Sequence, residues 1–298
     1  MRENRLEQSE SSRNALLLMG LTIVLWGVSW IVMKSMTKLI GPIDLVATRY
    51  VIAFFFLFAV QCWRRIPFSM PPFWLCLGIA VMQTVGFQVL AQFALMSGGA
   101  GQVVLLAYTM PFWVVFFSWR IMGNKPDAKY LIALGFGLVG LLMVLKPWQG
   151  MGGMASSLLA LLSGACWGIG AVWSKVMFEK YQPNIINLTV WQLLMGAIIT
   201  IPMGLLVPQQ PWVIGPELVI GLLYMGALAS GVGWLLWLSV IQRVSATVAG
   251  MSSLGVPVLA ILLAWVILGE VPDTLTKLGV ILVVTGLVVI NLPGRKKV

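Results

Sequence analysis

The sequence predicts an all-α membrane protein with ten transmembrane helices in two inverted five-helix repeats around a central cavity. Three observations lead to this fold class. First, 60% of the 298 residues are apolar and only 9% are charged, whereas soluble domains carry roughly 25% charged residues. Second, apolar runs of about 20 residues, the length that crosses a hydrocarbon core, recur along the chain. Third, the segment at residues 25–34 returns in similar form at residues 166–175, which indicates an internal repeat.

The repeat is marked by a Trp-Gly pair that precedes a lysine near the end of an apolar run. Trp26 and Lys34 carry this pattern in the first half, and Trp167 and Lys175 carry it 141 positions later. Five runs in each half would place the two copies in opposite orientations, which predicts an inverted repeat. Further matches follow in the same order: Pro42 with Pro183, Pro111 with Pro257, Asp127 with Asp273, and Gly140 with Gly286.

Turn-forming residues divide the first half into five apolar runs. Gly and Pro pairs at positions 41–42, 71–72 and 98–99, and the Lys-Pro-Asp turn at 125–127, separate them. We expect helices over residues 15–33, 43–62, 73–96, 101–119 and 128–146. Together they form the predicted first repeat, residues 15–147, which follows a cytoplasmic tail at residues 1–14.

The second half is divided in the same way. Turn formers at positions 183–184, 208–211 and 271–273 separate its runs. We expect helices over residues 155–177, 185–206, 217–240, 246–267 and 274–292. The predicted second repeat therefore covers residues 155–292, between a linker at 148–154 and a basic tail at 293–298.

Lysines and arginines are concentrated at one set of run ends. Fourteen of the 19 lie at the ends on the side of the termini, four lie at the opposite ends, and Arg49 lies within the second run. Cytoplasmic loops of membrane proteins carry an excess of these residues. We therefore expect a multi-pass protein of the inner cell membrane with both termini in the cytoplasm.

Several classes of function are disfavoured by the composition. The net charge of +10 arises from basic residues scattered at run ends, so no basic face for nucleic acid is predicted. The three cysteines are scattered through apolar runs and predict neither a disulfide framework nor a metal site. The chain has no histidine, and its carboxylates near the runs lie at run ends. We therefore expect no enzyme, no cofactor and no metal, and we predict no cleavable signal peptide.

Two prolines and two glycines inside the runs are candidate hinges. Pro111 and Pro257 lie at matched positions in the fourth and ninth runs, where a proline removes a backbone hydrogen bond. Gly86 and Gly231 lie in the third and eighth runs. Paired breaks are typical of a central binding site with hinges, although each residue alone would also suit close helix packing.

Polar and aromatic side chains inside the runs are candidates for substrate binding. Buried amides need partners, so glutamines in the third run either bond between helices or line a wet cavity. Deep tryptophans would either form aromatic walls for an amphipathic solute or fill space between helices. The tryptophans near run ends are expected to anchor at the membrane interface. The candidate lining residues are Trp26, Gln83, Phe87, Gln88, Tyr108, Met110, Trp167, Trp234 and Ser252.

Arg49 is the one charged residue well inside a run. Arg49 would either bind an anionic group of the substrate or extend its guanidinium toward the outer membrane interface, and the second interpretation is favoured. Proton-coupled carriers place a carboxylate or histidine in the pathway, and none is evident in the sequence. This favours a facilitator that moves substrate down its gradient.

Taken together, these residues resemble the EamA family of the drug/metabolite transporter superfamily. The resemblance rests on the two Trp-Gly segments, on Pro42 with Arg49 seven residues later, and on Gly269-Glu270 with Pro272, and it extends from about residue 15 to 292. It implies ten helices, inverted halves and a cavity lined by the first, third, fourth, sixth, eighth and ninth helices. Many members export metabolites, especially amino acids. Within the family the chain is similar to the YddG-type exporters of aromatic and other amino acids.

The chain departs from the family pattern at one position, where Asn124 rather than glutamate follows Gly123. It also lacks the first-helix glutamate of small multidrug carriers, which argues against proton-driven efflux of cations. We therefore expect a monomeric exporter of amino acids, including aromatic or apolar ones, that works by alternating access in the lipid bilayer. The alternatives are an exporter of drugs or nucleotide derivatives and a non-transporting membrane scaffold.

Overall fold

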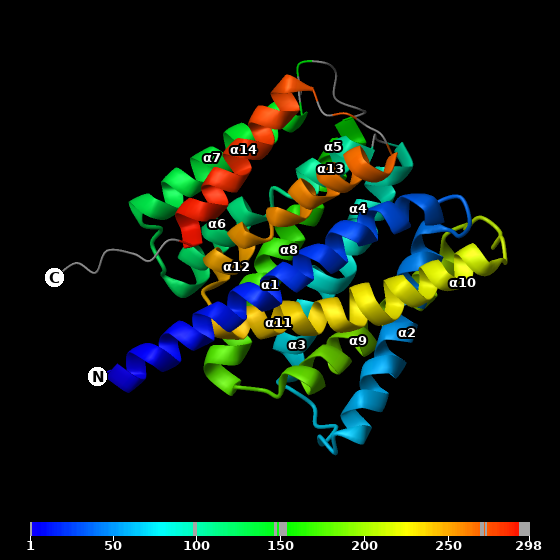
Figure 1. Ribbon diagram of the computed structural model, residues 1–298. Coiled ribbons are helices and arrows are strands. Elements are labelled where there is room, and N and C mark those ends of the chain that lie inside the picture. Colours follow the sequence, from blue (N-terminus) through cyan, green and yellow to red (C-terminus); the bar gives the residue numbers. More distant parts are fainter. Residues whose placement is uncertain are drawn as a thin grey trace.

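The computed structural model describes residues 2–97, 100–145, 148, 154–268, 271 and 273–291. Throughout these ranges the regular elements are helices packed side by side, as Figure 1 shows. The first half of the chain contributes α1 (Arg2–Met36), α2 (Pro42–Trp63), α3 (Phe73–Ile79), η1 (Ala80–Gly86), α4 (Phe87–Ser97), α5 (Ala100–Ala107), α6 (Met110–Met122) and α7 (Ala128–Leu145). The second half contributes α8 (Met154–Tyr181), α9 (Ile185–Leu206), α10 (Pro216–Leu223), η3 (Tyr224–Val232), α11 (Gly233–Arg243), α12 (Ala246–Ser252), α13 (Gly255–Leu268) and α14 (Thr274–Asn291).

Helical stretches long and apolar enough to cross a membrane account for much of the described chain. Four shorter apolar helices accompany them, at Met110–Met122, Ala128–Met143, Ala246–Ala260 and Thr274–Gly286. The six long stretches are Asn14–Met33, Pro42–Trp63, Phe73–Met96, Met154–Tyr181, Ile185–Leu206 and Pro216–Arg243.

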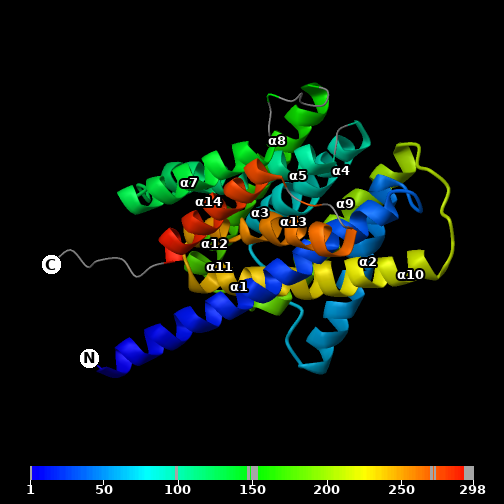
Figure 2. The ribbon, with the colours of Figure 1, turned by 45° about the horizontal axis from the view of Figure 1, so that its top comes forward.

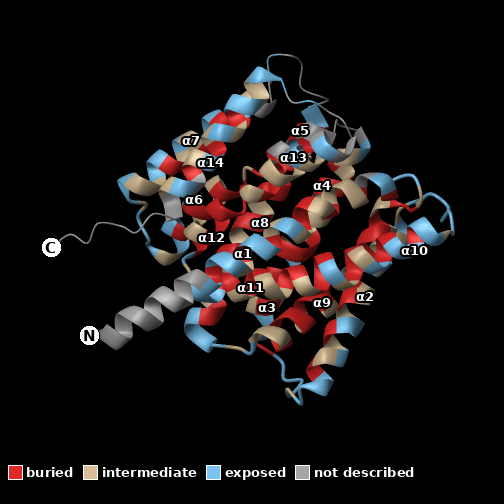
Figure 3. Ribbon diagram, in the orientation of Figure 1, coloured by how far each residue is buried: buried red, intermediate tan, exposed pale blue. Residues whose placement is uncertain are grey.

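Buried residues are concentrated at the centre of the helix bundle. Figure 3 shows buried residues gathered where α1, α4, α8 and α11 meet, and exposed residues along the outer faces. Large apolar side chains such as Leu205, Ile220 and Val266 are exposed there. An exposed apolar surface of this extent is typical of helices that face lipid, because hydrocarbon solvates these side chains as well as a protein core does.

The first helix of each half packs against the helices of the other half. From the second half, α8 packs against α4, α6 and η1 of the first half, and from the first half α1 packs against α11, α13 and η3 of the second. At the periphery α7 lies alongside α14 in both Figure 1 and Figure 2, and α2 packs against α9. These contacts therefore come in matched pairs: α1 contacts α11, α13 and η3 as α8 contacts α4, α6 and η1.

Local sequence explains where several helices begin. Pro42 and Pro216 occupy the first turns of α2 and α10, where a missing backbone N–H costs nothing. Asn184 caps α9, since its side-chain oxygen accepts hydrogen bonds from the backbone N–H groups of Ile186 and Asn187. These signals account for the agreement between the predicted helix at 185–206 and the observed α9.

One difference concerns the N-terminal end of the chain. The helix α1 begins at Arg2, so residues assigned by sequence to the tail at 1–14 continue the first helix from that point. The tail at 293–298 and most of the linker at 148–154 lie outside the described residues. The boundaries of the two repeats remain a prediction.

The fourth and ninth runs are broken helices. The chain leaves α-helix at Tyr108-Thr109 before α6 and at Ser253-Leu254 before α13. The sequence predicted paired breaks of these two runs at Pro111 and Pro257, and each run is interrupted just before its proline. Each proline lies in the first turn of a new helix, where its ring is tolerated because the N–H groups there have no intrahelical partner.

The third and eighth runs share a second irregularity. Each contains a π-helical segment between two α-helices, η1 between α3 and α4 and η3 between α10 and α11. The candidate hinge Gly86 ends η1, and Gly231 lies within η3. π-Helical turns are rare and occur often at functional sites. The four candidate hinge residues therefore all lie at or beside interruptions of regular α-helix.

Candidate binding cavity at the centre of the bundle

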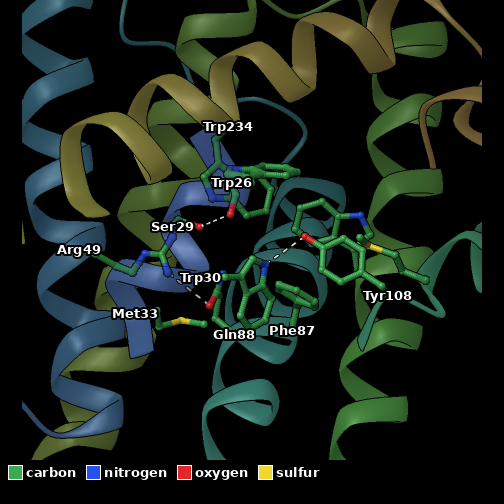
Figure 4. A pocket seen from close by; sticks show the side chains of 11 residues that line it. Trp26, Ser29, Trp30, Met33, Arg49, Phe87, Gln88, Tyr108 and Trp234 are labelled. Carbon is green, nitrogen blue, oxygen red and sulfur yellow. Dashed lines mark hydrogen bonds between the residues drawn. The ribbon is translucent and has the colours of Figure 1, made fainter. Parts of the chain in front are cut away.

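A narrow cavity lies between the two halves and is lined by residues of both. Six segments line it: α1, α2, α4, the break between α5 and α6 together with the start of α6, α8 and α11. Little of this space is wide enough for a water molecule, so the side chains nearly close it in this conformation. The lining residues, shown in Figure 4, are Trp26, Ser29, Trp30, Met33, Arg49, Phe87, Gln88, Tyr108, Met110, Trp167 and Trp234.

One face of α1 forms a wall of the cavity. Trp26, Ser29, Trp30 and Met33 recur every three or four residues, the spacing that puts side chains on one face of a helix. The indole N–H of Trp30 donates a hydrogen bond to the hydroxyl of Tyr108 at 3.2 Å, as Figure 4 shows. This bond joins α1 to the break in the fourth run, so the proline-broken segment contributes directly to the lining.

Four tryptophans form a cluster at the end of the cavity nearer the start of α1. The ring centroid of Trp167 lies 5.2 Å from that of Trp26, 5.2 Å from that of Trp234 and 5.3 Å from that of Trp237. Phe87 adds an edge contact to Trp167 at 4.8 Å. Tilted and edge-on pairs at such distances are favourable geometries for aromatic rings. The repeat-related Trp26 and Trp167 therefore meet, and they do so at the interface between the halves.

Side chains of the first half satisfy backbone carbonyls in both π-helical segments. The indole N–H of Trp26 donates to the carbonyl of Ala229 in η3 at 3.0 Å, and the Tyr50 hydroxyl donates to the carbonyl of Thr84 in η1 at 2.7 Å. Gly233 permits the first contact, since a Cβ there would lie 2.6 Å from the Trp26 Nε1. A backbone carbonyl of each irregular segment is thus bonded to an aromatic side chain of the first half.

Arg49 is buried and points inward, with only 3% of its surface exposed. Its Nε donates a hydrogen bond to the Ser230 hydroxyl at 2.7 Å, and its Nη1 lies 3.4 Å from the Gln88 side-chain oxygen. The favoured sequence interpretation, that Arg49 extends toward the interface, was therefore wrong. Placing an arginine at the centre of a membrane helix costs about 3 kcal/mol on insertion scales, and the long-range partner Ser230 offsets part of this cost.

The structure brings seven of the nine candidate lining residues into one cavity. Gln83 lies outside it: α8 presses on η1 at this point, and the Ser174 hydroxyl donates to the Gln83 side-chain oxygen at 3.1 Å. Ser252 is buried at the end of α12 and also lies outside the lining. For these two residues the structure favours packing between helices, because each is enclosed by neighbouring helices rather than by the cavity.

Sequence reasoning missed four lining residues, namely Ser29, Trp30, Met33 and Arg49. The first three follow Trp26 at three-, four- and seven-residue spacing, so extending its helical face along α1 would have found them. Arg49 was recognised as unusual, but its inward direction depends on Ser230, which is 181 positions away in the sequence.

The lining offers both aromatic surfaces and polar groups to a small molecule. It combines six aromatic rings, two hydroxyl groups, one amide and one guanidinium. Across the described residues, no group of three or more His, Cys, Asp or Glu side chains could hold a metal ion. Among the lining residues Arg49 is the only charged one.

Comparison with known proteins identifies the family. The pattern of the EamA-like transporter family matches the chain twice, over residues 13–146 and 154–292. The chain belongs to the EamA-like transporter family. It is therefore a multi-pass membrane protein of a transporter family, and the family unit occurs once in each half.

Named relatives of this EamA-like chain extend over nearly its whole length. "Uncharacterized transporter YoaV" of Bacillus subtilis is 26% identical, over 89% of this chain and 92% of the relative. "Probable amino-acid metabolite efflux pump" of Escherichia coli is 24% identical, over 96% of this chain and 98% of the relative. The protein of the same name from Salmonella typhimurium is 25% identical, over 90% and 91%.

A solved structure has the same fold. It is titled "Crystal structure of protein" and superposes with a TM-score of 0.79, covering 92% of this chain and 95% of its own at 21% identity. At this identity the likeness concerns the fold alone.

Proposed function

We propose that this EamA-like protein exports amino acids and similar metabolites across the inner cell membrane, by alternating access and as a facilitator. The observation that carries this proposal is a cavity at the centre of the bundle that both halves line, with polar groups at hydrogen-bonding positions among aromatic walls. Such a lining suits small amphipathic molecules with variable side chains. The names of the Escherichia coli and Salmonella typhimurium relatives support amino-acid metabolites as the substrate class.

Ten transmembrane helices in two inverted halves are part of the same proposal. The reciprocal packing of α1 and α8, and the paired π-helical segments and broken helices, support a two-fold relation between the halves. In alternating access one half rocks against the other around a site at their interface. Gly86, Pro111, Gly231 and Pro257 are the proposed hinges, since each lies at or beside weakened helical hydrogen bonding.

Both termini are proposed to lie in the cytoplasm, and the protein is proposed to work as a monomer. The orientation rests on the fourteen-to-four distribution of basic residues. Under this orientation the tryptophan cluster closes the cytoplasmic side of the cavity, and the substrate enters after Trp26, Trp167 and Trp234 separate.

A drug exporter selective for organic cations fits the cavity less well. The only charged lining residue is the cation Arg49, and a buried positive charge repels a cationic substrate in a medium of low dielectric constant. This argument favours zwitterionic or anionic metabolites over cations.

Proteoliposomes test the proposed function directly. We expect efflux of labelled phenylalanine and leucine from liposomes that contain the protein, saturating with substrate concentration and absent from protein-free liposomes. As a facilitator, the protein should give the same net efflux with and without an imposed pH gradient. If no amino acid crosses faster than in protein-free liposomes, the export proposal is wrong; efflux driven by the pH gradient would contradict the facilitator alone.

A further inference from the structure

Arg49 is a buried cation beside the cavity. Among the described residues no carboxylate forms an ion pair with it, and both of its hydrogen-bonding partners, Ser230 and Gln88, are neutral. Proteins normally pair a buried charge with an opposite one, because an unpaired charge loses its hydration without compensation. An arginine kept in this position therefore requires an anion that none of the described residues supplies.

The geometry leaves one edge of the guanidinium available. Ser230, from η3 of the second half, occupies Nε at 2.7 Å. The contact of Nη1 with Gln88 at 3.4 Å is long for an N–H···O bond and correspondingly weak. Figure 4 shows Arg49 reaching from α2 toward Gln88, beside Met33 and Trp30 at the cavity. The Nη1–Nη2 end, with its parallel N–H groups, is thus the end that an incoming ligand would meet.

We propose that Arg49 is the carboxylate receptor of the cavity, so that the exported metabolites are those that carry a carboxylate group. This inference rests on the proposed function, because it names the chemical group by which the transport site selects its substrate. A planar guanidinium binds a planar carboxylate through two parallel N–H···O bonds. On binding, the carboxylate replaces the weak contact with Gln88, and Ser230 holds Arg49 in position from the opposite half.

The charge of the lining specifies the ligand further. One guanidinium with no acidic lining residue balances one negative charge, so a monoanionic carboxylate matches it better than a dianionic phosphate. No lining residue offers a counter-charge to an ammonium group. The site therefore requires the carboxylate and tolerates the ammonium, and the aromatic rings of Trp30, Phe87 and Trp167 receive the side chain of the metabolite.

Three ligands with one aryl group separate these contributions. Phenylalanine carries both charged groups, 3-phenylpropionate lacks the ammonium, and phenylalaninamide lacks the carboxylate. Binding to the purified, detergent-solubilised protein is measured by ligand-dependent thermal stabilisation. We expect phenylalanine and 3-phenylpropionate to bind, and phenylalaninamide to bind about a hundredfold more weakly, as is typical when one partner of a desolvated charge pair is removed.

Variants of Arg49 and Ser230 provide the matched test. R49Q should abolish the preference for phenylalanine over phenylalaninamide, because the contact with the carboxylate and the repulsion of the cationic amide are lost together. R49K should retain part of the preference, since it keeps the charge without the planar fork. S230A keeps the guanidinium but removes the hydrogen bond to its Nε. It should weaken the binding of phenylalanine and 3-phenylpropionate by about tenfold, the effect of losing one hydrogen bond to a charged group. The binding of phenylalaninamide should be unchanged.

The outcomes of the two proposals are distinct. Equal binding of phenylalanine and phenylalaninamide by the unmodified protein, or an undiminished preference in R49Q, overturns the carboxylate receptor even if amino acids are exported. If R49Q does not fold, binding of the three ligands to the unmodified protein and to R49K tests the carboxylate receptor instead. If carboxylates bind through Arg49 but no amino acid is exported, the carboxylate receptor is supported and the export proposal is wrong.

Discussion

Replacing Trp167 with alanine is expected to destabilise the protein by about 3–5 kcal/mol, the range for truncating a buried tryptophan. The Trp167 side chain is 2% exposed and contacts the rings of Trp26, Phe87, Trp234 and Trp237. Its loss leaves a void that joins the cavity and removes the centre of the tryptophan cluster. Denaturation in mixed micelles measures the change in the free energy of unfolding.

Two variants control this prediction. W167F keeps most of the ring volume and removes an indole N–H that has no hydrogen-bond partner among the described residues, so we expect a much smaller loss. W74A truncates a tryptophan that is 80% exposed, and we expect a change within about 0.5 kcal/mol. Equal losses in W167A and W74A would contradict the central role of the cluster in packing.

Replacing Gly170 with alanine is expected to destabilise the contact between α8 and η1 by about 1–3 kcal/mol, the usual cost of overpacking. A Cβ at Gly170 would lie 2.9 Å from the backbone N and 3.0 Å from the Cα of Gln83. Backbone atoms cannot move aside as a flexible side chain can, so the two helices must separate. Thermal unfolding of the purified protein should show the loss as a lower midpoint temperature.

Gly20 is the matched control for Gly170. It lies in α1, and a Cβ built there meets no heavy atom within 4 Å. Because alanine has a higher helix propensity than glycine by about 1 kcal/mol, G20A should be neutral or slightly stabilising. A midpoint in G170A as high as that in G20A would show that the close approach of α8 to η1 is not required.

Much of the fold could be predicted from the sequence because membrane helices leave a strong compositional signal. Apolar length predicted α9 and most of the third and eighth runs, and turn formers marked their ends. The repeat predicted that Trp26 and Trp167 occupy equivalent positions. Seven candidate lining residues lie together because deep aromatic and amide side chains in apolar runs have few alternatives to one central cavity.

What could not be predicted depends on contacts between distant segments. The π-helical turns of η1 and η3 have no signature in residue type; they are accompanied by hydrogen bonds from Tyr50 to Thr84 and from Trp26 to Ala229. The inward direction of Arg49 depends on Ser230 in the other half. Local propensity carries no information on such partners, so sequence reasoning placed this arginine at the interface.

The central claim is that the substrate occupies the cavity between the halves. Ser29 lines this cavity, whereas Ser35 is exposed six residues further along the same helix. The most direct measurement compares thiol labelling of S29C and S35C, each in a background with Cys62, Cys76 and Cys166 replaced by serine and with phenylalanine efflux retained. The account predicts that saturating phenylalanine slows labelling of S29C several-fold and leaves labelling of S35C unchanged. Efflux of phenylalanine together with substrate-independent labelling of S29C would contradict it.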